Sequence, residues 1–90
     1  NYTLDNGPLS KYETNAWLGI PYAEKPLSKL RFKRPVPVKN WSGILKTNRI
    51  RDVCIQNIEE LANNQSEDCL YLNIWTPRKS NIKNLPVMVC

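Results

Sequence analysis

A chain of 90 residues with a net charge of +5 has the size of one small domain and can bury only a thin apolar core. Seven prolines interrupt the apolar residues, so long helices are disfavoured and extended or turning backbone is expected. No apolar run approaches the ~20 residues of a membrane span, and Asn1 is followed by no charged and apolar leader, so we expect neither an anchor nor a signal peptide in this sequence.

The first part of the chain is predicted to form strands and turns. Asn6-Gly7 supplies the positive φ of a tight turn, which favours two short strands within residues 2–12. Residues 15–26 are predicted to be a strand that ends in an irregular turn. Residues 34–43 contain too many prolines for a central strand of any sheet.

Much of the excess positive charge lies in residues 28–39, SKLRFKRPVPVK. Such a stretch can bind a polyanion such as nucleic acid or heparin. We favour a half-buried strand with one solvated face, because basic and apolar side chains alternate. The alternating residues are Lys29, Leu30, Arg31, Phe32 and Lys33. No nucleic-acid module accompanies the charges, so no nucleic-acid partner is expected.

The second part is predicted to contain one short helix and two strands. Apolar residues at helical spacing, with Asp52 as a cap, favour a helix over residues 52–63. Residues 70–75 are apolar on both sides, as in a strand inside a covered sheet. Residues 85–90, LPVMVC, are predicted to be a second buried strand with no turn behind it, which indicates a piece of a longer protein.

Cysteines and glycosylation triplets favour an oxidising, secreted or extracellular location. The three cysteines are an odd number, so one of them is unpaired or pairs elsewhere. Three triplets fit the Asn-x-Ser/Thr acceptor pattern, and the bulky Trp41 makes the second a poorer acceptor. The acceptor candidates are Asn1, Asn40 and Asn64.

Catalytic chemistry is mostly absent from these residues. The chain has no histidine, so it cannot assemble a Ser-His or Cys-His pair, and we predict no metal site and no cofactor. None of the five serines lies in a Gly-x-Ser-x-Gly elbow. Glu67 and Asp68 are adjacent and point apart on an extended chain, so they cannot flank one bond and are interpreted as structural ion-pairing groups.

Residues 66–77, SEDCLYLNIWTP, resemble the Glu-Asp-Cys-Leu-Tyr-Leu-Asn signature of the type-B carboxylesterase and cholinesterase-like family. Further blocks are similar to the N-terminal segments of that family, in the same order, so that the resemblance covers residues 4–90. These blocks are WLGIPYAEKP, LRFKRPVPVKNWSG and VCIQ.

The resemblance implies an α/β class, with residues 1–90 as the N-terminal piece of one α/β-hydrolase domain. This piece would comprise a small antiparallel N-terminal sheet and the first strands of the central sheet, truncated before the oxyanion loop. The parent would hydrolyse small-molecule carboxylic esters through a Ser-His-acid triad, and no catalytic residue would lie in this chain. The remainder of the hydrolase domain would be needed to complete the fold.

The family resemblance also implies two crosslinks. A disulfide is expected between Cys54 and Cys69, and a structural salt bridge between Arg31 and Glu67. Cys90 stays outside the disulfide and is predicted to be a buried free thiol in an apolar strand.

Departures from the family pattern bear on specificity. Lys25-Pro26-Leu27-Ser28 stands where the family commonly has Pro-Pro-x-Gly, so that turn is expected to be reshaped. The loop of residues 55–68 lacks the aromatic residue that binds choline in cholinesterases, which favours a general carboxylesterase. Two alternatives stay open: a non-catalytic, neuroligin-like adhesion protein, and an independent basic binding module.

Overall fold

The computed structural model describes residues 14–59, 64–78, 81 and 83–90 of the chain. Within these ranges the regular elements are strand β1 (Thr14–Pro21), the short 3-10 helix η2 (Ser28–Leu30) and strand β2 (Tyr71–Pro77). The chain divides into two units, of which one is Trp17–Ile74 and the other contains the described residues on either side of it. The hairpin predicted over residues 2–12 lies outside the described residues.

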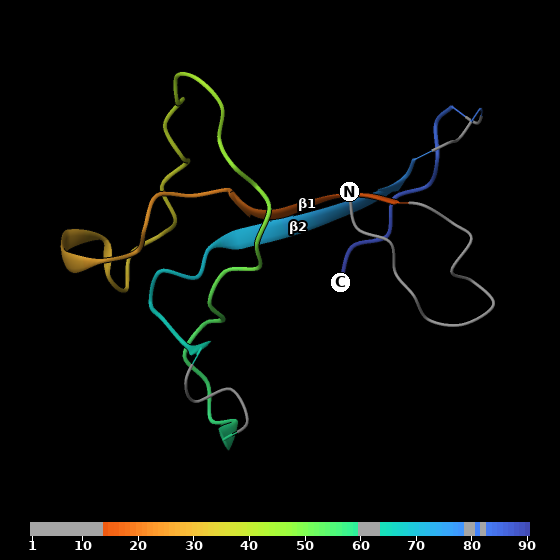
Figure 1. Cartoon of the computed structure of the whole chain (residues 1–90). Helices are drawn as coiled ribbons and strands as arrows, with labels where there is room; N and C mark the ends of the chain where they lie inside the picture. The colour runs from red at the N-terminus through yellow and green to blue at the C-terminus, as the bar shows by residue number, and fades with distance from the viewer. Residues whose placement is uncertain (1–13, 60–63, 79–80, 82) are drawn as a thin grey trace. The chain divides into compact units, whose positions relative to one another are not determined.

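Strands β1 and β2 form a two-stranded antiparallel sheet, in which they lie side by side (Figure 1). The backbone N–H of Gly19 donates to Oδ1 of Asn73 at 2.9 Å, and the backbone N–H of Tyr22 donates to the carbonyl of Leu70 at 3.4 Å. Rising residue numbers on one strand therefore meet falling numbers on the other, which is the antiparallel register. The two strands predicted over residues 15–26 and 70–75 are confirmed.

A third segment approaches the far edge of β1 because Gly19 has no side chain. The backbone N–H of Leu18 donates to the carbonyl of Thr47 at 2.9 Å, and Leu18 forms a parallel bridge with Asn48. A Cβ atom on Gly19 would lie 2.7 Å from the carbonyl oxygen of Arg49 and 2.7 Å from Cγ of Arg51. Only glycine permits this approach, and its φ of +77° is a conformation that other residues rarely adopt.

The apolar core is thin, as the chain length predicts. Among the described residues, the buried apolar side chains are Leu18 and Ala23. The prediction that strand β2 is covered on both faces is wrong: Leu72, Ile74 and Trp75 are all exposed. The physical reason is that β2 pairs with a single strand and has no further layer packed on it in the part of the chain that the structure describes.

The half-buried strand predicted for Lys29–Lys33 is wrong. Residues 28–30 form the 3-10 helix η2, and the backbone N–H groups of Leu30, Arg31 and Lys33 donate to carbonyls three residues earlier. Phe32 has a φ of +58° and is 93% exposed. The alternation of basic and apolar side chains did not lead to a strand here. Local turns satisfy the backbone hydrogen bonds that a neighbouring strand would otherwise satisfy.

The helix predicted over residues 52–63 is wrong for residues 52–58, whereas Glu59 and, after the gap, Asn64 have 3-10 conformation. Residues 52–58 are non-helical, and Val53 pairs with Gln65 in a parallel bridge. The backbone N–H of Val53 donates to the carbonyl of Asn64 at 2.9 Å, and the N–H of Ser66 donates to the carbonyl of Val53 at 2.9 Å. Long-range pairing thus replaces helical bonds in a segment too short to be stable as a helix alone. Residues 60–63 lie outside the described residues.

The buried strand predicted over residues 85–90 is not formed. Val87, Met88 and Val89 are 86%, 94% and 92% exposed, and this stretch is non-regular. Cys90 is a free cysteine as predicted, but it is exposed and not buried. A β-branched apolar run becomes a buried strand only where neighbours cover it, and none of the other described segments does so. Residues 85–90 therefore add no strand to the β1–β2 sheet among the described residues.

Because the backbone of Arg49 lies so close to Gly19, a Cβ atom at position 19 should lower the stability of the fold. Gly19→Ala should lower the free energy of unfolding by about 2–3 kcal/mol, from a strained φ and from contact with backbone. Gly43 is the matched control, since it has a φ of +76° but nothing within 4 Å of the place where a Cβ atom would lie. Gly43→Ala should cost about 1 kcal/mol. Equal losses in denaturant unfolding of the two variants would contradict the assignment.

Candidate functional site

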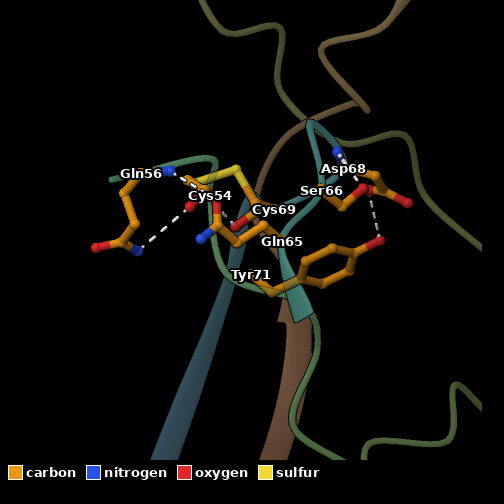
Figure 2. The surroundings of a disulfide bond; sticks show 7 residues. All are labelled: Cys54, Gln56, Gln65, Ser66, Asp68, Cys69 and Tyr71. Atoms are coloured by element: carbon orange, nitrogen blue, oxygen red, sulfur yellow. Dashed lines mark hydrogen bonds between the residues drawn. A yellow bond between two sulfur atoms is a disulfide. The ribbon is translucent and has the colours of Figure 1, made fainter. Parts of the chain in front are cut away.

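A disulfide joins Cys54 to Cys69, with the two Cα atoms 5.0 Å apart (Figure 2). It closes a loop of sequence separation 15 directly before strand β2. Figure 2 shows the crosslink above the start of this strand, with the side chains of Gln65 and Tyr71 close to it. The bond therefore attaches the segment that contains Cys54 to the beginning of β2.

The side chain of Gln65 organises the inside of this loop. Its Oε1 accepts a hydrogen bond from the backbone N–H of Gln56 at 2.9 Å, and its Nε2 donates to the carbonyl of Ile58 at 3.4 Å. The side chain of Gln56 in turn donates to the carbonyl of Cys54 at 3.2 Å. An amide suits this position because it carries both a donor and an acceptor, which two opposed backbone groups require.

Glu67 and Asp68, which precede Cys69, each pair with a different cation. Arg31 donates through Nε to Oε1 of Glu67. Their side chains are 55% and 38% exposed, so this ion pair is an exposed one and contributes less than about 1 kcal/mol. The pair nevertheless connects the turn after η2 to the residues next to the disulfide.

Asp68 lies in a more enclosed cluster, with its side chain 20% exposed. Oδ2 of Asp68 lies 3.1 Å from Nζ of Lys25, and Oδ1 accepts a hydrogen bond from the hydroxyl of Tyr71 at 2.8 Å. The guanidinium of Arg51 lies over the Tyr71 ring, 4.7 Å from its centroid. Ser66 accepts a further hydrogen bond from the backbone N–H of Asp68 at 3.1 Å (Figure 2).

These contacts shift the pKa values of two groups in opposite directions. Partial burial acts to raise the pKa of the Asp68 carboxyl, but the Tyr71 hydroxyl and two nearby cations outweigh it, so this pKa lies below its ordinary value. Partial burial and the Asp68 carboxylate raise the pKa of the Tyr71 hydroxyl. The cluster therefore holds aspartate as the anion and tyrosine as the neutral donor.

Chemically, this arrangement positions backbone and does not activate a nucleophile. The hydroxyl of Ser66 is engaged by a backbone N–H, and the 90 residues contain no histidine to act as its base. Within the described ranges no group of three potential metal ligands comes together, and no helix there is long and apolar enough to cross a membrane. An open hollow of about 340 Å³ beside the Arg31–Glu67 pair is lined partly by Phe32 and Ile55.

Sequence reasoning missed three contributors to this cluster. Lys25 stood out only as a departure from the family's proline, yet it is the cation that meets Asp68. Gln65 and Tyr71 carried no pattern that foretold their side-chain bonds. The reshaped turn is also visible: the backbone N–H of Leu27 donates to the carbonyl of Lys25 at 2.8 Å, and Ser28 has a φ of +50°. A left-handed conformation favours the glycine that the family commonly has there.

Two of the three glycosylation candidates can be located. Asn40 and Asn64 are both exposed, on different loops of the unit Trp17–Ile74. Asn1 lies outside the described residues.

The sequence and the fold are similar to those of known esterases. The carboxylesterase family model matches residues 4–90. The chain is 45% identical to the cholinesterase of Mus musculus over 94 residues, covering 91% of this chain and 15% of that protein. It is 42% identical to the acetylcholinesterase of Leptinotarsa decemlineata, covering 80% of this chain and 13% of that protein. A solved structure of PNB esterase superposes with a TM-score of 0.65 at 36% identity, over 84% of this chain and 14% of that one.

The fold class is that of the α/β hydrolases, represented here by a small antiparallel sheet. The chain belongs to the carboxylesterase family. It spans 13–15% of the length of the curated relatives it matches.

The disulfide should contribute strongly to stability. The double variant Cys54→Ser/Cys69→Ser should lower the free energy of unfolding by about 3 kcal/mol, because the closed loop restricts the unfolded chain. The matched control is Cys90→Ser, which removes an exposed free thiol and should change stability by less than about 0.5 kcal/mol. Denaturant titration checks both values. Mass spectrometry that links Cys90 to either partner would overturn the pairing.

Acid should weaken the cluster around Asp68. Since the folded-state pKa is lowered, its stabilising effect is complete above the unfolded value of about 3.9 and is lost as pH falls through the folded value. From about pH 6 to about pH 3, the Tm of the native protein should fall more than that of Asp68→Asn. Glu59→Gln, which removes an exposed carboxylate elsewhere, should retain the native slope. An equal slope in Asp68→Asn would contradict the role of this carboxylate.

Proposed function

We propose that this chain is a scaffold part of a serine carboxylic ester hydrolase. In this proposal residues 1–90 form part of a single hydrolase domain, whose Ser-His-acid triad and oxyanion loop lie outside them. The observation that carries it is the family match over residues 4–90, which coincides with the crosslinked cluster at Glu67-Asp68-Cys69. Relatives named as cholinesterases and a structural neighbour named as an esterase support ester hydrolysis.

The role of this segment is positional. Arg31–Glu67 and Lys25–Asp68 connect residues 25–31 to the residues that precede β2, and the disulfide connects Cys54 to the same place. Two ion pairs and one covalent bond thus converge on three consecutive residues. This convergence fixes the start of β2, as a strand of an α/β hydrolase requires if the loops that carry catalysis are to be held on rigid elements.

The proposed substrate is a small-molecule carboxylic ester without a choline requirement. The loop of residues 55–68 contains no aromatic residue, and a quaternary ammonium group is recognised by aromatic faces. Secretion is the proposed localisation, because a disulfide persists in oxidising compartments and the chain carries three acceptor triplets.

The test is hydrolysis by the full-length protein that contains this chain. Purified from the medium of secreting cells, it should hydrolyse p-nitrophenyl butyrate, prefer it to acetylthiocholine, and be labelled by a fluorophosphonate that reacts with activated serines. The 90-residue chain alone should give no turnover above a denatured control. A folded full-length protein that neither hydrolyses esters nor takes the label would support the neuroligin-like adhesion alternative. Turnover by the 90-residue chain would overturn the scaffold role.

A further inference from the structure

A loop with a fixed neck presents most of the basic stretch of the chain. Ala23 and Pro37 form an antiparallel bridge, and the backbone N–H of Glu24 donates to the carbonyl of Val36 at 2.8 Å. These contacts bring together the two ends of residues 25–35, which we call the basic loop. Figure 1 shows η2 at the end of this loop that lies farthest from β1.

Tight turns hold the basic loop internally as well. At η2 and the turn after it, the backbone N–H of Arg31 donates to the carbonyl of Ser28 at 3.2 Å. The backbone N–H of Lys33 donates to the carbonyl of Leu30, also at 3.2 Å. The ion pair of Arg31 with Glu67 adds a contact to the residues next to the disulfide. Backbone hydrogen bonds, and not an apolar core, therefore set the shape of this loop.

The basic loop contains five cations and no acidic residue. Two of the five pair with Glu67 and Asp68. Lys39 lies beside the neck, because its backbone N–H donates to the Glu24 carboxylate at 2.9 Å. The other three cations of the loop and Lys39 are exposed, and within the ranges that the structure describes they form no ion pair. These four cations are Lys29, Lys33, Arg34 and Lys39.

Exposed cations of this kind suit a polyanion. The half-buried strand that competed with this interpretation is not formed, so the charges are not the solvated face of a sheet. A basic cluster attracts anions, and ammonium and guanidinium groups form charge-assisted hydrogen bonds with sulfate oxygens. Because the turns are already formed, binding would order little further backbone.

Covering these cations with the rest of a larger domain would cost free energy, because buried charges require partners. Phe32 differs from them, since its apolar ring lines the hollow beside the Arg31–Glu67 pair together with Ile55. Packing that covers this apolar side of the basic loop is favourable and requires no burial of charge. The four cations therefore stay at the surface of the larger protein.

We propose that Lys29, Lys33 and Arg34 of the basic loop, with Lys39 beside its neck, bind a sulfated polysaccharide of the heparin type. The preference for a polysaccharide over a nucleic acid rests on the secretory location in the proposed function. It is supported by Phe32, the one aromatic residue of the loop. The Arg31 guanidinium lies over this ring at 4.8 Å from its centroid, so that face is not open for stacking on a base.

The experiment uses the full-length protein secreted by a eukaryotic cell, with heparin as the probe. The native protein should bind immobilised heparin at about 0.15 M salt, and its affinity should fall steeply as the salt concentration rises. The triple variant Lys29→Gln/Lys33→Gln/Arg34→Gln should bind at least about tenfold more weakly. The salt dependence of its affinity should also be shallower, because fewer cations contact the polyanion.

The matched control is Lys46→Gln/Arg49→Gln/Lys83→Gln, which removes the same charge from exposed cations outside the basic loop. Its affinity for heparin should change by less than about twofold. Equal losses in the two triple variants would mean that net charge alone attracts heparin, and would overturn the site. Native protein that does not bind heparin at this salt, or that binds desulfated heparin equally well, overturns it too. Equal affinity for duplex DNA overturns the choice of a polysaccharide.

A footprint on the native protein does not depend on whether any variant folds. Bound heparin should slow the acylation of Lys29 and Lys33 by an N-hydroxysuccinimide ester, as located by peptide mass spectrometry. The acylation of Lys46 and Lys83 should be unchanged. Lys29 and Lys33 that react equally fast with and without heparin overturn the inference.

Ester hydrolysis measured on the same preparation separates the two proposals. Active protein that does not bind heparin contradicts the polysaccharide site alone. Inactive protein whose basic loop is protected by heparin contradicts the hydrolase alone.

Discussion

The structure depends on the crosslink between Cys54 and Cys69, because few apolar contacts are present to replace it. Two buried apolar side chains in the described residues cannot offset the conformational entropy of loops as long as these. A disulfide stabilises the fold by lowering the conformational entropy of the unfolded chain, and this stabilisation does not require an apolar core. The Val53–Gln65 bridge joins the residue before Cys54 to a residue four positions before Cys69, so it forms in a chain that the disulfide already restricts.

The electrostatic contacts follow from the same shortage of core. Exposed ion pairs are individually weak, and the Arg31–Glu67 pair is one of these. The Asp68 cluster is stronger in principle, since a less exposed carboxylate receives a cation, a phenol and a nearby guanidinium at once. Lys25 is notable because the family commonly has a proline there. A lysine leaves the backbone less restricted than a proline would, but its ammonium group forms an ion pair with Asp68.

Sequence reasoning succeeded where a residue's effect is local or where a motif carries its own context. The strands predicted over residues 15–26 and 70–75 overlap the observed β1 and β2, because a mostly apolar segment that ends near Pro21 and a run that is apolar on both sides each favour extended backbone. It failed for residues 29–33 and 52–58, where a periodic pattern implied partners that are not there, and tertiary pairing or local turns won instead. The bonds of Gln65 were unpredictable, because an amide can meet any backbone group that a loop brings within reach.

The exposed apolar residues and the absence of catalytic groups have one explanation under the proposed function. Val87, Met88 and Val89 are almost fully exposed, and β2 has one strand neighbour among the described residues, so this segment presents apolar surface that a larger sheet would bury. A segment that supplies strands but no histidine contributes geometry, and its residues need only be held in place. Convergence of the disulfide and both ion pairs on Glu67-Asp68-Cys69 fixes the start of β2 even before that surface is covered. Crosslinking is thus concentrated where strand position matters, while the apolar surface is left for packing.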